Sequence, residues 1–210
     1  MNKKIIWGVI VVAMIAIVGV YLINKSSQVA SPLVQDTTDT KEVSEWKIHK
    51  NTKEYKNIKD GYTFEYPTKL SLSTSIDGVN LTHSIPFENT DGGCDMVGNA
   101  KVSKTLVDFN VSISIVPGQI KPPYVDGTFS GGSLKGDWVY RGAEGCGQTV
   151  YYFPISGNRT LILTKHELQV LSPVVAPDVR NKVLAVPGVI SYEESNKIIE
   201  EILSTLKFTK

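Results

Sequence analysis

The sequence predicts an α+β domain in which a helix packs against the apolar face of an antiparallel sheet. The first observation is the alternation of apolar and polar residues at positions 106–116, which is the period of a half-buried strand. The second is a pair of apolar runs, 150–153 and 161–164, whose connecting residues 154–159 favour a turn, so that the pair forms a hairpin. The third is an apolar stripe with helical spacing at residues 198–206, close to the C-terminus.

The predicted strands can be placed in chain order. Residues 62–67 alternate aromatic and polar side chains and stop at Pro67, which cannot donate a ladder hydrogen bond. Residues 79–85 alternate as well, and residues 138–140 are a further strand. The apolar faces of the strands at 79–85 and 106–116 comprise Val79, Leu81, His83 and Ile85, and Phe109, Val111, Ile113 and Ile115.

The closing helix has a clear start. Ser191 precedes Glu194 by three residues, which is the spacing of a capping box. Residues 46–58 are predicted to hold a strand and a turn. Residues 168–186 contain two prolines and fit a loop with a short helix.

The N-terminal part predicts membrane attachment. Residues 5–23 carry no charge, and 19 helical residues span about 28 Å, close to the hydrocarbon thickness of a bilayer. We expect a cytoplasmic N-terminus at 1–4, a transmembrane signal anchor at 5–23, a flexible linker at 24–45 and an extracytoplasmic domain at 46–210.

The charge distribution orients this anchor. Lys3 and Lys4 precede the apolar run and place its N-terminal side in the cytoplasm. The alternative is a cleaved signal peptide, whose nearest cleavage site would be Gln28-Val29-Ala30. Both readings export the C-terminal part, and the anchor makes the chain a single-pass protein of the cell membrane.

The two cysteines, Cys94 and Cys146, both follow the anchor and lie in glycine-rich segments. An oxidising compartment favours a disulfide between them, which would close a loop of about 50 residues. Two buried reduced thiols are the first alternative. A metal or redox pair is the second, although two cysteines without a C-x-x-C spacing make a poor zinc site.

Other candidate chemistry is sparse. The three histidines His49, His83 and His166 have neither metal-binding nor catalytic spacing, and His83 is expected to be half-buried on its strand. The glycine-rich segment 130–136 lacks the pattern of a nucleophile elbow or a phosphate loop and predicts a hairpin turn. Asn89, Asp91 and Asp95 could offer oxygens to Ca²⁺, but their spacing favours a solvated turn.

Four strand aromatics, Trp138, Tyr140, Tyr151 and Tyr152, fit either packing within the sheet or a binding face. We therefore predict no catalytic, cofactor-binding or metal site, and no cofactor. The net charge is +1 without a basic stripe, so nucleic acid is not an expected partner.

Two segments at opposite ends of the domain resemble PsbP-like domains, a frame shared by many uncharacterised exported bacterial proteins. They are Gly61-Tyr62-Thr63-Phe64-Glu65-Tyr66-Pro67, with Trp46 before it, and residues 198–208, which resemble that family's closing helix and final strand. The resemblance implies an α/β/α sandwich with a central antiparallel sheet, and a role by contact. The family's aromatic after the tyrosine–proline step is replaced here by Thr68-Lys69-Leu70.

The expected function is a non-enzymatic, membrane-tethered module that binds a protein or an envelope component. The alternative is a hydrolase of envelope polymers whose site forms only in the fold, for example from His83 or His166 with Ser133 or Asp137. A purely structural domain, without a persistent pocket, is the third possibility.

Overall fold

The computed structural model describes residues 51–89, 94 and 102–209. The chain divides into two compact units, Met1–Trp46 and Lys47–Lys210, and all described residues belong to the second. The predicted anchor, the linker, His49, Asp91 and Asp95 lie outside the described residues. In the described ranges, no helix is long and apolar enough to cross a membrane.

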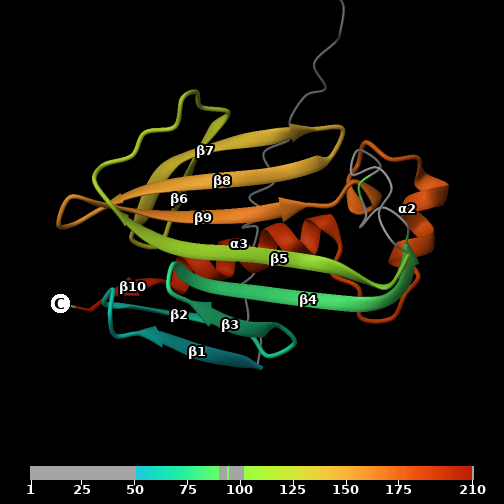
Figure 1. The fold of residues 1–210 in the computed structure, drawn as a ribbon, viewed down its shortest axis with the longest axis horizontal. Helices are drawn as coiled ribbons and strands as arrows, with labels where there is room; N and C mark the ends of the chain where they lie inside the picture. The colour runs from blue at the N-terminus through green and yellow to red at the C-terminus, as the bar shows by residue number, and fades with distance from the viewer. Residues whose placement is uncertain (1–50, 90–93, 95–101, 210) are drawn as a thin grey trace, which may run out of the picture. The chain divides into compact units, whose positions relative to one another are not determined.

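The larger of two sheets has seven antiparallel strands in the order β3-β4-β5-β9-β8-β7-β6 (Figure 1). Its strands are β3 (Ser71–Ser75), β4 (Gly78–Asn89), β5 (Ser103–Pro117), β6 (Gly127–Gly131), β7 (Leu134–Ala143), β8 (Cys146–Ile155) and β9 (Arg159–Glu167). The predicted strands at 79–85, 106–116, 138–140, 150–153 and 161–164 are all confirmed. The β8–β9 and β6–β7 hairpins form at the predicted turns, because residues 156–158 and 132–133 connect those strands.

The smaller sheet joins the two ends of the domain. It contains β1 (Thr52–Asn57), β2 (Tyr62–Pro67) and β10 (Lys207–Phe208), with β2 in the middle. Lys207 pairs with Thr63 and Phe208 with Tyr62, both in the antiparallel sense. β10, near the C-terminus, therefore pairs with β2, near the start of the described residues.

Two α-helices and one 3-10 turn complete the described fold: η2 (Gln169–Leu171), α2 (Pro177–Leu184) and α3 (Tyr192–Thr205). The Ser191 side chain accepts a hydrogen bond from the Glu194 backbone N–H at 3.1 Å, which confirms the predicted cap of α3. Residues 168–186 contain the expected short helix, α2, whose Pro177 occupies the first helical position, where a missing N–H costs nothing.

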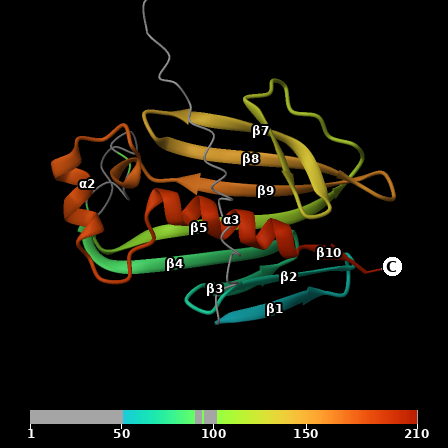
Figure 2. The same ribbon diagram turned by 180° about the vertical axis from the view of Figure 1, so that it is seen from behind.

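One apolar core holds the elements together. Tyr62 and Phe64 of β2, Ile198 and Ile202 of α3, and the inward residues of β4, β5, β8 and β9 form a single buried cluster. α3 thus lies between the small sheet and one face of the large sheet, as Figure 2 shows. The buried stripe of α3 is the predicted one.

The predicted fold class, an α+β domain arranged as an α/β/α sandwich, is wrong, because the described residues are mostly β-sheet. Strands, in two sheets, make up 54% of the described residues, and helices, with the 3-10 turn included, make up 17%. α3 covers one face of the large sheet, and in the described part of the chain no helix covers the opposite face (Figures 1 and 2). The physical reason is that residues 168–186 supply only the eight-residue α2, which packs at the end of the sheet near Ile85 and Leu106.

A β-bulge in β5 changes which residues face inward. Between the pairs His83↔Phe109 and Ile85↔Leu106, β4 advances by two residues and β5 by three. Simple alternation would bury Val107 together with Phe109, but Val107 is 44% exposed and Asp108 is buried instead. The bulge therefore brings a carboxylate into the interior.

Candidate functional site

An elongated hollow lies beside α3, over the outer strands of the large sheet. It consists of two adjoining pockets of about 350 and 340 Å³ that share four wall residues. We call the combined hollow the trough. Its shared walls are Trp138, Thr149, Glu167 and Tyr192; one half adds Tyr140, Glu144, Gly145, Ser172 and Val174, and the other adds Thr128, Phe129, Tyr151, Asn196, Ile199 and Glu200.

The trough exists because α3 is narrower than the sheet it covers. α3 runs over β5 and β9, whereas β7 and β8 extend beyond it (Figure 2). The helix contributes Tyr192, Asn196 and Ile199, which are spaced by four and three residues and therefore lie on one side of the helix. Among the described residues, the trough is the space between that side of α3 and the strands β7 and β8.

Aromatic rings form the sheet side of the trough. Trp138 pairs with Tyr151 and Tyr140 pairs with Thr149 in the β7–β8 ladder, so these four side chains share one face. Phe129 of β6 meets Tyr151 edge to face, with ring centroids 6.1 Å apart. Aromatic residues from two predicted strands thus line the trough together with α3, and this arrangement depends on tertiary packing.

The Trp138 indole fills space that is free because Gly127 has no side chain. Gly127 lies directly opposite Trp138 in the β6–β7 ladder. A Cβ at Gly127 would lie 2.7 Å from three atoms of the indole. The indole therefore packs over the bare backbone of β6.

Glu167, which lines both halves of the trough, forms a buried ion pair with Lys165 beneath it, and we call this pair the floor of the trough. Lys165 Nζ lies 2.8 Å from a Glu167 carboxylate oxygen and donates to Asn196 Oδ1 at 2.7 Å. The Thr149 hydroxyl donates to the other Glu167 oxygen at 2.7 Å. Lys165 Nζ also lies 4.3 Å from the centre of the Tyr192 ring, within cation–π range. Both charges are nearly inaccessible to water and are satisfied within the network.

Burial shifts the pKa values of Lys165 and of the tyrosines around this floor. It lowers the pKa of Lys165 below its usual range, although Glu167 opposes the shift. Burial, reinforced by the negative charge of Glu167, raises the pKa of Tyr151 to about 12. The same two causes raise the pKa values of Tyr140 and Tyr192. The trough tyrosines are therefore neutral hydroxyls at physiological pH.

One wall residue has an unusual backbone. Glu144 and Gly145 form the two-residue turn between β7 and β8, both with positive φ, 52° and 83°. Asn, Asp or Gly is the ordinary choice at the first position of such a turn, so glutamate there is mildly strained. The turn places the Glu144 carboxylate at one end of the trough, and Glu200 of α3 lines the other half.

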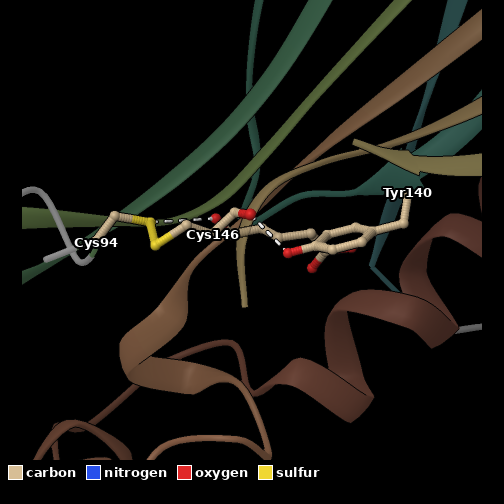
Figure 3. The surroundings of a disulfide bond; sticks show 4 residues. Cys94, Tyr140 and Cys146 are labelled. Carbon is tan, nitrogen blue, oxygen red and sulfur yellow. Dashed lines mark hydrogen bonds between the residues drawn. A yellow bond between two sulfur atoms is a disulfide. The ribbon is translucent and has the colours of Figure 1, made fainter. Parts of the chain in front are cut away.

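The expected disulfide is present and lies at the same end. It joins Cys94 and Cys146, with Cα atoms 5.7 Å apart (Figure 3). The Tyr140 hydroxyl donates to the Cys146 carbonyl at 2.6 Å, which connects the crosslinked backbone to the aromatic wall. Glycine is required on both strands here, because a Cβ at Gly147 would lie 2.2 Å from the Arg141 oxygen and one at Gly142, opposite it, 1.9 Å from the Cys146 oxygen.

The structure does not bring the other predicted residues into one site. His83 Nδ1 lies 2.7 Å from the buried carboxylate of Asp108, and the His83 ring itself is half-buried. Ser133 lies in the β6–β7 turn, and its hydroxyl is 3.5 Å from the Leu206 carbonyl. The strands β5, β9 and β8 separate β4, which carries His83, from β7, which carries Asp137. His166 is exposed on β9, next in sequence to the trough floor.

Asn89 has a structural role in the described part of its loop. Its amide nitrogen donates to the carbonyls of Phe87 and Thr105 at 3.2 and 3.1 Å. Its side chain therefore fixes the end of the β4–β5 hairpin.

Sequence reasoning missed Lys165, Glu167 and Asn196. A signal existed in β9, because alternation from Leu161 and Leu163 assigns Lys165 and Glu167 to the buried face. Two adjacent inward positions with opposite charges indicate a buried ion pair. Their meeting with Asn196 depended on where α3 crosses the sheet, which no local pattern specifies.

The comparisons with known proteins provide little help. No protein-family model and no curated protein matches the chain. A crystal structure of a protein from Bacteroides thetaiotaomicron VPI-5482 is similar with a TM-score of 0.39 and 13% sequence identity, over 75% of this chain and 48% of that one. The chain thus spans about half the length of that protein, and a likeness this distant carries no argument about function.

Proposed function

We propose that the chain is an exported binding module, attached to the membrane through residues 5–23, that holds a protein segment or an envelope component in the trough. The observation that carries this proposal is the trough itself, an elongated hollow with aromatic walls and a fixed polar floor. Binding sites combine these features: apolar walls supply affinity, and a few oriented polar groups supply specificity.

The walls are organised before any ligand arrives. The indole of Trp138 rests on Gly127, Tyr140 is bonded to the disulfide-linked backbone, and Tyr192 packs on Lys165. Side chains already held in one conformation lose little entropy on binding, which increases affinity. Trp138, Tyr140 and Tyr192 are half-buried and belong to none of the described core clusters, so packing of the core does not account for these rings.

The location supports a ligand from outside the cytoplasm. The apolar run at 5–23 predicts export, and the Cys94–Cys146 disulfide fits an oxidising compartment. A domain tethered close to the membrane meets envelope polymers and the exposed parts of membrane proteins. We therefore propose a contact role at the outer side of the membrane.

Co-sedimentation with envelope material tests this proposal. The purified full-length chain, in mild detergent, is mixed with washed envelope fragments of the source organism, and the bound fraction is measured over a range of concentrations. We expect Tyr140→Ala combined with Tyr192→Ala to weaken binding by about tenfold or more. The control is Ile76→Ala, because Ile76 is 85% exposed and lies on the β3–β4 turn, away from the trough.

Two results would contradict the proposal. One is binding that the trough variant and the control variant support equally well. The other is the absence of saturable binding by a full-length chain whose circular dichroism shows that it is folded.

A further inference from the structure

We propose that the trough selects a cationic ligand, an extended chain carrying ammonium or guanidinium groups such as a basic peptide segment. This inference rests on the proposed function and specifies the chemistry of its ligand. It follows from the charges of the trough walls, from the aromatic rings between them and from the way in which the protein's own lysine is held there.

The charges of the walls have one sign. The charged residues that line the two halves of the trough are Glu144, Glu167 and Glu200, and all three are acidic. Lys165 neutralises Glu167 in the floor. The exposed carboxylates of Glu144 and Glu200 therefore set the field inside the trough, which attracts cations and repels anionic polymers.

The aromatic walls favour the same ligand. Rings attract cations through their electron-rich faces, and tryptophan does so most strongly. Trp138, Tyr140 and Tyr151 line the space between the two carboxylates. The trough tyrosines are neutral at physiological pH, and burial raises their pKa values further, so the attraction comes from the ring faces and the carboxylates together.

The protein already holds one ammonium group with this chemistry. Lys165 Nζ lies against the Tyr192 ring, a carboxylate of Glu167 and the Asn196 amide oxygen. The same combination recurs around the trough, where Glu144 and Glu200 lack a lysine or arginine among the lining residues. A cationic side chain from outside would complete it.

The length of the trough favours a chain over a single small cation. Trp138 lines both halves, of about 350 and 340 Å³, and each half is lined by one exposed acidic residue, Glu144 or Glu200. A small amine would occupy only one half. An extended chain with cationic groups along its length engages both.

Calorimetric titration of the full-length chain tests this inference. The probes are the nonapeptide Gly-Lys-Gly-Lys-Gly-Lys-Gly-Lys-Gly and its counterparts in which arginine, glutamine or glutamate replaces lysine; chitotetraose represents a neutral glycan. We expect the lysine and arginine peptides to bind at least about tenfold more tightly than the glutamine peptide, and the glutamate peptide not to bind. Raising the salt from 50 to 300 mM should weaken the binding severalfold.

Matched variants distinguish binding in the trough from an effect of the protein's net charge. Glu144→Gln with Glu200→Gln should weaken the lysine peptide by about tenfold. Glu54→Gln with Glu88→Gln removes the same charge from exposed positions on β1 and β4, outside the trough, and should change affinity by less than twofold. Equal effects of the two double variants would overturn the inference, because the binding would then reflect overall charge.

The remaining outcomes are also decisive. Trough-dependent binding of chitotetraose, without selective binding of the cationic peptides, would overturn the inference and leave the proposed function standing. If no peptide binds, while envelope fragments still bind through Tyr140 and Tyr192, the inference is likewise overturned and the proposed function stands. Envelope binding that is unchanged in the trough variants would instead contradict the proposed function.

Discussion

The indole of Trp138 occupies the space that a side chain at Gly127 would need. The two residues face each other across the β6–β7 ladder, and a Cβ at Gly127 would approach three indole atoms to 2.7 Å. Atoms in folded proteins do not approach this closely without rearrangement, so the glycine fixes where the indole can lie.

Gly127→Ala is therefore expected to displace the indole and to weaken trough binding by about threefold to tenfold. The strain should lower the free energy of unfolding by about 1–2 kcal/mol. Trp138 can be observed alone after Trp7→Phe and Trp46→Phe, since the chain has three tryptophans. A shift of its emission maximum would report the displacement.

A double-mutant cycle is the control for this prediction. In a Trp138→Ala background the extra methyl group at position 127 has no indole to contact. Gly127→Ala should then lower the free energy of unfolding by much less. An equal cost in both backgrounds would contradict the proposed contact.

Lys165→Ala should be strongly destabilising, by about 3–5 kcal/mol, because it leaves the carboxylate of Glu167 buried without its cation. Replacing both charges, with Lys165→Met and Glu167→Leu, should cost far less, since neither charge then needs solvation. Urea unfolding measures both variants. A double variant as unstable as Lys165→Ala would show that packing, and not the unpaired charge, dominates.

Asp108→Ala should cost about 2–4 kcal/mol and loosen the start of α3. The buried carboxylate accepts a hydrogen bond from the Ile190 backbone N–H at 2.7 Å and lies 2.7 Å from His83 Nδ1. Amide hydrogen exchange at Ile190 should accelerate more than the global loss of stability explains. Unchanged exchange at that amide would argue against this anchoring role.

Cys94→Ser combined with Cys146→Ser should lower the free energy of unfolding by up to about 4 kcal/mol. The two cysteines are 52 residues apart, and a crosslink over a loop of that length restricts the unfolded chain accordingly. Thermal unfolding of the oxidised, reduced and double-serine proteins measures the effect. Identical mobility of oxidised and reduced samples on denaturing gels would show that the bond does not form.

Stability should fall as the pH rises between about 10 and 12. Burial raises the pKa values of Tyr62 and Tyr151 from 10.0 to about 12, so unfolded tyrosines lose their protons first. The unfolded state then binds fewer protons than the folded state, and stability that is fully present below pH 10 is lost as the pH passes 12. Ultraviolet titration should show late-ionising tyrosines, and Tyr151→Phe should remove one of them.

The local patterns of this sequence predicted most of the elements but not their arrangement. Alternation located β2, β4, β5 and β9, and the capping box at Ser191 located α3, because these signals depend only on neighbouring residues. The sandwich failed because it required a second covering helix that residues 168–186 are too short and too rich in proline to provide. The bulge at Asp108 was equally hidden, since an inserted residue shows only in the register with β4.

The candidate site was even less accessible to sequence reasoning. Trp138, Tyr140 and Tyr151 were recognised as strand aromatics for which packing and binding were both open, but their place beside α3 depends on where that helix crosses the sheet. Glu144 and Glu200 lie 56 positions apart in the chain and line one trough only in the fold. Half-buried aromatic side chains indicate a binding site only when the elements packed beside them are known.

The pairing of β10 with β2 has a consequence for biosynthesis. The helical wall of the trough is α3, and the strand that follows it, Lys207–Phe208, pairs with residues 62 and 63, which were made much earlier. An emerging chain can form the hairpins of the large sheet, but β10 can pair with β2 only after residue 208 has left the ribosome. The small sheet is therefore expected to be completed last, after all strands of the large sheet have been synthesised.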